Sequence, residues 1–400
     1  LKIDAELRPR FELRHGYKTL HPDGVKPAAF ISQRVRLNTH YKIKKFDFYL
    51  SLQDVRVWGN VPQLNASDVN GFSLHQAWAN IGMGKYFSTK FGRQEIIYDD
   101  SRIFGNVGWA QQARSHDALL FKLKKDSLEI DFGLAYNQDK EGIKGNVLTV
   151  PRTYKTFQYL WLRKRWKKVS ASFLFLSNGM QYIDTADASL TETRFSFTAG
   201  THLKYQTGNF WMVGNAYYQF GRDVKNNTLN AYLFGLELSY KLPKVVTLKL
   251  GGEIQRGNDH GTISNRENRA FSPLYGTNHK FNGLMDYFYV GNHANSIGLL
   301  DLYFKMGLKF GPKSNLSVAF HNFSSPAYFV KKELGGELDL VYAHKFNKIV
   351  TLKVGYSHLF ASSGMRSLKG NFDGNANLWG WVMVVVKPTF LNKTFDKKKK

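Results

Sequence analysis

The chain has 400 residues and no cysteine, and its 56 lysines and arginines against 31 acidic residues give a net charge of +25. A basic excess of this size attracts polyanions such as nucleic acid, acidic polysaccharide or an anionic lipid surface. The sequence contains no helix-turn-helix, zinc-finger spacing or basic zipper, so nucleic acid is not expected as a partner. It also lacks a run of about 18 apolar residues, which excludes a transmembrane helix.

Polar and apolar residues alternate from the first residue onward. In residues 1–14 charged side chains take one face and apolar side chains take the other, as in a strand with one wet side. A change of polar parity between Gln53 and Asp54 predicts a β-bulge in the third such segment. The further segments with a strand pattern are residues 30–43, 47–58, 72–81, 86–95, 114–124, 128–136, 154–165, 169–177, 193–205, 210–220, 230–241, 245–255, 297–310, 315–322, 333–344, 349–359 and 377–386.

The connections between these segments alternate between turns of about two to four residues and loops of about ten to forty. Short periplasmic turns, long extracellular loops and an even strand number are typical of bacterial outer-membrane barrels. We therefore expect an all-β fold: a closed antiparallel transmembrane β-barrel of about 18 strands. A single barrel domain is expected over residues 1–391, followed by a basic C-terminal tail over residues 392–400.

The expected location is the bacterial outer membrane. The absence of cysteine fits the oxidising bacterial envelope. No signal peptide is visible at Leu1, so the chain is expected to be a mature form.

Aromatic residues near the predicted strand ends are a second indication of a membrane protein. Rings with a polar edge prefer the boundary between membrane and water, and the alternative is cross-strand packing in a soluble sheet. We expect a belt at this boundary formed by Phe46, Trp58, Trp78, Tyr86, Tyr159, Trp161, Trp166, Tyr205, Tyr240, Trp379 and Trp381.

The polar faces of the strands would line a lumen with an excess of basic residues. An arginine fork binds carboxylates bidentately and stays charged, so a row of arginines suits weak, repeated contact with a passing polyanion. The alternative is a network of salt bridges that stiffens the barrel. The strand residues expected to contact solutes include Arg8, Arg10, Arg34, Arg36 and Arg194.

The stretch FGRQEIIYDDSRIFGNVGWAQQARSHD, residues 91–117, places charges where a soluble protein would have a dry core. Burying such charges without partners costs several kcal/mol each. The conflict disappears if these side chains line water, and they are Arg93, Glu95, Arg102, Arg114 and Asp117.

Residues 92–118 resemble the alginate-export family of outer-membrane barrels, in their Gly-Arg-Gln-Glu, their acidic-x-Arg element and their Arg-x-x-Asp return. A second segment, GTNHKFNGLMDYF at residues 276–288, is similar to the His-Lys-Phe-x-Gly-x-x-Asp-x-Phe stretch of that family. The resemblance implies an eighteen-stranded pore that passes an acidic exopolysaccharide by diffusion. It also implies that the charged residues of segment 91–117 belong to a constriction, and that a loop over the pore carries His279, Lys280 and Asp286.

The expected function is a porin that passes alginate-like acidic polysaccharide or other small anions through an Arg/Lys-lined lumen. One alternative is a plugged structural or partner-docking barrel, because residues 256–296 could fill a lumen. An outer-membrane hydrolase is less favoured, since no nucleophile elbow or metal-ligand spacing appears. No catalytic residue, metal or cofactor is expected. Outer-membrane lipid and lipopolysaccharide are the expected surroundings, a monomer is the expected state, and an envelope protein is a further candidate partner.

Overall fold

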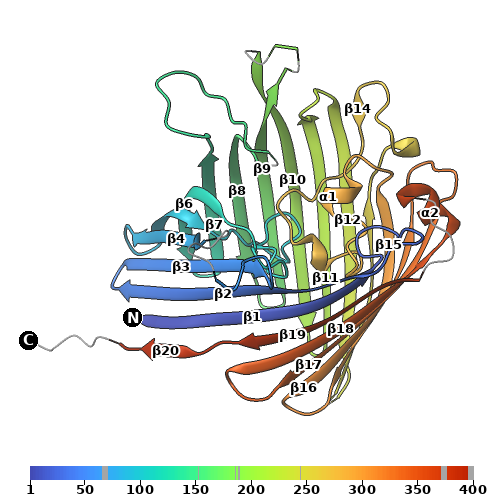
Figure 1. The fold of residues 1–400 in the computed structure, drawn as a ribbon. Helices are drawn as coiled ribbons and strands as arrows, with labels where there is room; N and C mark the ends of the chain where they lie inside the picture. Colours follow the sequence, from blue (N-terminus) through green and yellow to red (C-terminus); the bar gives the residue numbers. More distant parts are fainter. Residues whose placement is uncertain are drawn as a thin grey trace, which may run out of the picture.

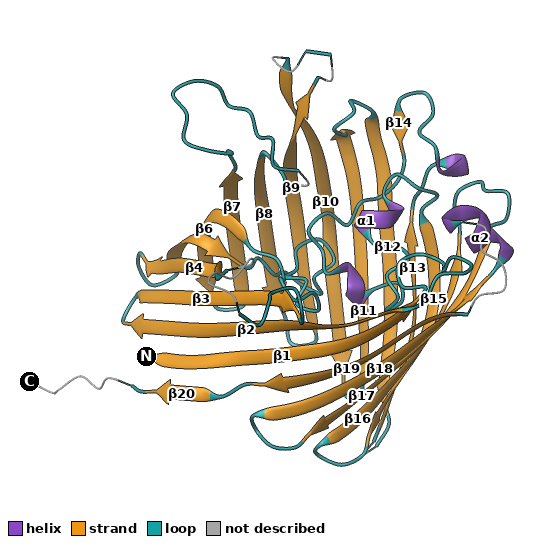
Figure 2. Cartoon of the chain, in the orientation of Figure 1, coloured by secondary structure: helices purple, strands orange, loops and turns teal. Residues whose placement is uncertain are grey.

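The computed structural model describes residues 1–64, 71–151, 153–184, 186–187, 190–243, 245–370 and 376–394. Within these ranges, eighteen long antiparallel strands follow one another around a closed barrel, and the last of them, β19, pairs with β1 (Figure 1). Short helices and one two-residue strand interrupt the loops, and a short strand follows the last barrel strand (Figure 2). No helix in the described part of the chain is long and apolar enough to cross a membrane.

The elements have the following bounds: β1 Lys2–His15, β2 Ala28–Ile43, β3 Phe46–Val57, β4 Ser73–Gly82, β5 Phe87–Gln94, β6 His116–Lys125, β7 Leu128–Tyr136, β8 Thr156–Arg165, β9 Val169–Ile183, β10 Thr191–Thr207, β11 Phe210–Arg222, β12 Thr228–Lys241, β13 Val246–Gln255, η1 Asp259–Gly261, β14 Glu267–Asn268, η2 Asn278–Lys280, α1 Val290–His293, β15 Leu299–Lys309, β16 Ser314–Ser324, β17 Glu333–Lys345, β18 Val350–Ala361, α2 Ser363–Lys369, β19 Asn377–Val386 and β20 Thr389–Asn392.

The two faces of the barrel wall differ in chemistry as the alternation predicts. Along β1, Leu7 and Phe11 lie on the outer face with 39% and 42% of their surface exposed, whereas Arg8 and Arg10 point inward and are 7% and 5% exposed. Because successive side chains of a strand point to opposite faces, this pattern sorts apolar residues outward and polar residues inward. The prediction of a closed antiparallel barrel of eighteen strands is confirmed.

The short turns lie together at one end of the barrel, and residues in the left-handed region close several of them. Lys44, Asp126, Gly208 and Gly311 have φ values of 49°, 51°, 54° and 83°. Such residues give a hairpin turn the twist of its two strands. At the opposite end the connections 184–190 and 223–227 are shorter than expected, because β9 to β12 run further than the alternation indicates.

Two expectations about strand boundaries are corrected. The bulge predicted in the third segment lies in its partner β4: Ser51 pairs with Gln76 and Leu52 with Leu74, so that His75 is the extra residue. The predicted tail also begins too early, because Asn392 of β20 still pairs with Lys2. The lysines at positions 397–400 lie outside the described residues.

Four aromatic residues assigned to the membrane boundary lie inside the barrel instead. Tyr159, Trp161, Trp379 and Trp381 are 0–4% exposed and belong to two apolar clusters inside the wall. The prediction of a belt is wrong for these four, because it considered their place along a strand and not the face on which they lie. Trp58 and Trp166, by contrast, are each 56% exposed.

Candidate functional site

The β5–β6 loop, residues 95–115, folds into the barrel and is held there by arginines of the wall (Figure 1). Arg8 donates hydrogen bonds to the carbonyl oxygens of Gly108, Trp109 and Ala110 at 2.7, 3.2 and 3.1 Å. It also donates to the side-chain oxygen of Gln111 at 3.0 Å. These bonds provide charged donors for loop carbonyls that are shielded from water, which would otherwise be costly to bury.

Two further wall arginines complete this attachment. Arg10 donates to the carbonyl oxygen of Trp109 at 2.9 Å and lies over its indole ring at 4.1 Å from the centroid. Arg34 donates to the carbonyl oxygen of Gln111 at 3.2 Å and pairs with Glu6. All three arginines therefore bind the loop backbone, and this use was not anticipated from the sequence.

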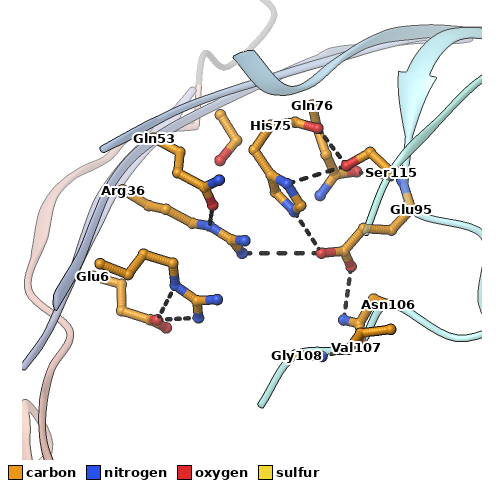
Figure 3. A network of polar contacts seen from close by, with 12 residues as sticks. Glu6, Arg36, Gln53, His75, Gln76, Glu95, Asn106, Val107, Gly108 and Ser115 are labelled. Carbon is orange, nitrogen blue, oxygen red and sulfur yellow. Dashed lines mark hydrogen bonds and ion pairs between the residues drawn. The ribbon is translucent and has the colours of Figure 1, made fainter. Parts of the chain in front are cut away.

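Glu95 anchors the start of the same loop to the wall (Figure 3). Its carboxylate accepts hydrogen bonds from the ring of His75 at 2.8 Å and from the amide of Asn106 at 3.0 Å. The Arg36 guanidinium lies 3.9 Å away and donates to Gln53 at 2.8 Å. Burial acts to raise the pKa of Glu95, but these hydrogen bonds and charges outweigh it and hold the pKa below its ordinary value.

The β13–β15 loop, residues 256–298, also enters the lumen and rests on buried carboxylates of β13, β15 and β17. Met285 and Leu284 donate their backbone N–H groups to Glu337 at 2.8 Å and to Asp339 at 3.2 Å. The Asn282 amide donates to Asp301 at 3.1 Å and to Glu253 at 3.0 Å.

Apolar burial adds to this attachment. Met285 and Phe104, one from each inward loop, are 0% and 1% exposed. Fully burying a side chain of this size contributes about 1.5–3 kcal/mol. Both loops are thus held to the barrel wall by buried apolar contacts as well as by hydrogen bonds.

The two inward loops meet each other along residues 276–282, which we call the partition. Lys280 donates to the carbonyl oxygen of Asp100 at 2.7 Å, and Arg114 donates to that of Gly276 at 3.2 Å. The ring of His279 stacks on that of Trp109, with their centroids 4.7 Å apart.

His279 also pairs with Asp286 at 2.9 Å, and Tyr17 of the β1–β2 loop donates to the same carboxylate at 2.7 Å. Burial acts to raise the pKa of Asp286, but His279 and Tyr17 reverse the shift and lower it. His279 lies in the same loop as Asp286, and the hydrogen bond from Tyr17 is the contact by which the ionised carboxylate favours the docked arrangement of the second loop.

Two cavities lie on either side of the partition. The loop-side cavity, of about 520 Å³, opens towards the long loops and is lined by Asn278, His279 and the loop-side ends of β1 to β3. The turn-side cavity, of about 540 Å³, is lined by Lys280, Phe281 and the turn-side halves of β10 to β13, β15 and β16. Segment 278–281 therefore separates two chambers within one barrel.

The two cavities differ in charge. The loop-side cavity has five basic residues, Arg10, Arg14, Lys18, Arg56 and Arg114, against Glu12 and Asp286. The turn-side cavity has Lys204, Lys249, Lys280 and Lys305 against Asp99, Asp100, Glu237, Glu253 and Asp301. The chamber that faces the long loops is thus the more basic of the two.

Arg102 of the β5–β6 loop contacts both the second inward loop and the wall. It is 1% exposed, forms an ion pair with Glu253 and donates to Asn282 at 3.2 Å. Arg102 and Arg114 thus contact the partition, as Lys280 contacts Asp100, whereas Glu95 contacts His75 of the wall and Asn106 of its own loop.

Arg93 and Asp117 do not belong to this group. They pair with each other at 2.8 Å, and their side chains are 42% and 61% exposed. Arg93 shares its face of β5 with the exposed Phe91, and Asp117 shares its face of β6 with the exposed Phe121. The assignment of these two residues to the lumen is therefore wrong, and the alternation of each strand already contained the signal.

Arg194 is also placed away from the constriction. It lies at the loop end of β10, pairs with Glu192 at 2.9 Å and lies over the ring of Tyr182. It lines neither of the two cavities. Its predicted contact with solutes in the lumen has no support in this geometry.

Several residues of the site were not singled out from the sequence. Trp109 and Gln111 lie within the charged stretch 91–117, but nothing in their spacing shows that arginines of β1 and β2 bind them. Tyr17 and Lys18 lie in a loop with no strand pattern, so their contribution to the loop-side cavity depends on long-range packing.

Bacterial outer-membrane proteins of comparable length share the fold. OccAB4 of Acinetobacter baumannii has a TM-score of 0.66 at 13% identity, over 97% of this chain and 98% of that chain. The outer membrane protein opdK from Pseudomonas aeruginosa has a TM-score of 0.61 at 11% identity, over 97% and 99%. At such identities the likeness shows the fold. No curated protein matches the chain.

A model of the family described as alginate export matches residues 1–325. The description of this family names export, which is a transport process. A closed barrel with inward loops and a match over most of its length therefore identify this protein as an outer-membrane channel that belongs to the alginate export family.

Proposed function

We propose that the channel passes anionic solutes that carry carboxylates, by diffusion through the two chambers. The observation that carries this proposal is the basic excess of the loop-side cavity, where Arg14, Arg56 and Arg114 face an aqueous space. Arg14 and Arg56 remain 33% and 30% exposed although each pairs with an acidic neighbour. Basic side chains that line a solvent-filled chamber raise the local concentration of anions.

Aromatic rings in the same cavity favour sugar acids among the anions. Arg14 lies over the rings of Tyr17 and Phe30, at 4.3 and 4.7 Å from their centroids. A flat apolar ring beside a cationic group matches a uronate, which has an apolar sugar face and a carboxylate.

The size of the chambers favours small anions or short oligosaccharides over a long acidic polymer. Each cavity has a volume of about 520–540 Å³, which is in the range of sites for small molecules. A continuous polysaccharide would need the partition to separate from the β5–β6 loop. We therefore propose that small carboxylates pass in the docked arrangement and that a polymer passes only after the loops move.

A plugged or partner-docking barrel is the second candidate, and one observation favours it: both inward loops are docked by buried contacts. In this case a partner protein of the envelope would release them.

We further propose that the channel is a monomer surrounded by outer-membrane lipid and lipopolysaccharide, because its outer face is rich in exposed apolar residues.

The test is single-channel current in a planar bilayer, with the reversal potential recorded in a salt gradient. Anion selectivity with transient block by glucuronate is the expected result. Block by polyuronate but not by glucuronate would favour the polymer, and cation selectivity would overturn the proposal. A silent channel that conducts after deletion of residues 257–282 would support the plugged barrel.

A further inference from the structure

The turn-side cavity contains a pair of lysines that face each other directly. Lys249 of β13 is the register partner of Lys305 of β15, and both line the cavity. Like charges directly opposite each other on neighbouring strands destabilise a sheet. Glu237 and Asp301 line the same cavity and offset part of this repulsion, and an anion bound between or beside the ammonium groups would offset more of it.

The lysines of this cavity are only partly neutralised. Lys249 pairs with Glu237 at 2.7 Å. Among the described residues, Lys204 and Lys305 form no ion pair within 4.0 Å, and Lys305 lies over the ring of Tyr303 at 4.2 Å. Lys280 reaches into the same cavity from the partition and donates to a backbone carbonyl, not to a carboxylate.

Most carboxylates of the cavity have partners of their own. Glu253 pairs with Arg102, and Asp301 accepts from His321 at 2.9 Å and from Asn282 at 3.1 Å. These acids are bound within the wall and the loops. With Glu253 paired to Arg102 and Glu237 paired to Lys249, three acids, Asp99, Asp100 and Asp301, remain beside Lys204, Lys280 and Lys305, and the carboxylate of a ligand would compete with them for these lysines.

The remaining polar groups of the cavity suit hydroxyls. Asp100 accepts from the amide of Asn215 at 2.6 Å, and both residues line the cavity beside Asp99. Trp211 and Tyr303 supply aromatic surface on the wall. A ligand with one carboxylate and several hydroxyls would find lysine donors for the carboxylate and carboxylate or amide groups for the hydroxyls in the same cavity.

We propose that the turn-side cavity is a second binding station for a compact hydroxylated carboxylate, such as a sugar acid, held by Lys204, Lys280 and Lys305. The proposal rests on the proposed passage of anions and adds a second site in series. A solute would then leave the loop-side cavity, pass the partition and bind again before it reaches the short turns. Two weak sites in series allow binding and release at each step.

The test uses the full-length protein in a planar bilayer, with sodium glucuronate added to the solution on one side of the membrane and then to the solution on the other side. The wild type should show transient blocks from both sides, and glucose should give none. In the double variant Lys204→Gln/Lys305→Gln, block from the side of the short turns should weaken. The half-blocking concentration of glucuronate on that side should increase about tenfold. Block from the other side should change by less than about twofold.

Lys313→Gln is the matched control, because Lys313 is exposed in the turn 310–313 at the same end of the barrel and lines neither cavity. Lys204→Arg/Lys305→Arg should restore the block, since it keeps the charge. If the double variant fails to insert, the single variant Lys305→Gln replaces it, and an increase of about threefold is expected.

An anion-selective wild type that is blocked from only one side would overturn the second station and leave the proposed function intact. Unchanged block of the double variant from both sides would overturn it as well. A cation-selective wild type without block from either side would overturn the proposed function itself.

Discussion

Arg93 lies at the end of β5 and Arg114 at the end of the loop that follows, yet they face opposite sides of the barrel wall. Arg114 lines the loop-side cavity and binds the partition, whereas Arg93 pairs with Asp117 on the outer face. A charge that lines the lumen lies close to passing ions, whereas a charge on the outer face is farther from them and is screened by salt. Two arginines that are equivalent in sequence therefore have different effects on permeation.

We expect Arg114→Gln to reduce anion selectivity, with the permeability ratio of anion to cation falling by about two- to fivefold. Arg93→Gln should leave this ratio unchanged, which makes it the matched control. The reversal potential in a tenfold salt gradient is the measurement. Equal effects of both substitutions would contradict the placement of the two side chains.

Asp286 makes docking of the second loop dependent on pH. Its pKa is lowered in the docked loop, because His279 and Tyr17 outweigh the effect of burial. Because the pKa is lowered, the ionised carboxylate stabilises docking fully at pH values above its unperturbed pKa of 3.8. This stabilisation is lost as the pH falls from there through the lowered pKa.

Current fluctuations of the open channel should therefore be small at pH 6 and increase as the pH falls below about 4. Asp286→Asn should show the larger fluctuations already at pH 6. Asp139→Asn is the control, because Asp139 is bound to Thr149 in an exposed loop far along the chain from both inward loops. Fluctuations of Asp286→Asn that match those of the wild type at pH 6 would count against this role.

The strands themselves could be predicted from the sequence, and the two inward loops could not. A strand shows its nature in a period of two and in the turn residues beside it, both of which are local. The docking of residues 108–111 depends on Arg8, which lies 100 residues from Gly108, and on Arg34, which lies 77 residues from Gln111. The row of arginines was visible in the sequence, but its partners were not.

The β13–β15 loop contains one glycine that its path requires. Gly283 has a φ of +83°, and a Cβ atom at this position would lie 2.6 Å from the carboxyl group of Glu337. The left-handed backbone and the close carboxylate together exclude a side chain. The loop can cross the buried acids of β17 only with glycine at this point.

Gly283→Ala should destabilise docking of this loop by roughly 1–3 kcal/mol without unfolding the barrel. Limited trypsin digestion in detergent measures this effect, because Lys280 in the partition becomes a cleavage site when the loop leaves the wall. Gly145→Ala is the control: its φ is +78°, and a Cβ atom added there would have no neighbour within 4 Å. Equal protection of Lys280 in both variants would contradict the tight crossing.

At the scale of the whole molecule, the net charge of +25 is distributed between the lumen, the turns and the loops. Only the part that lines water-filled chambers should act on permeating ions, and mobile ions screen it. The Debye length falls from about 30 Å at 0.01 M to about 3 Å at 1 M ionic strength.

Anion selectivity should therefore decrease severalfold between about 0.01 M and 1 M salt. Reversal potentials at a fixed salt ratio and increasing absolute concentration provide the measurement. The Arg114→Gln variant should show a weaker dependence. Selectivity that stays constant over this range would indicate that the channel selects by size alone.

The partition also gives the channel a polarity along its axis. One side of it presents mainly arginines and the other side presents lysines interspersed with carboxylates. A charge profile that is asymmetric across a narrow barrier accumulates permeant ions under one sign of voltage and depletes them under the other. The protein should therefore behave as a rectifier, and the direction of larger current would report which way round the barrel is inserted.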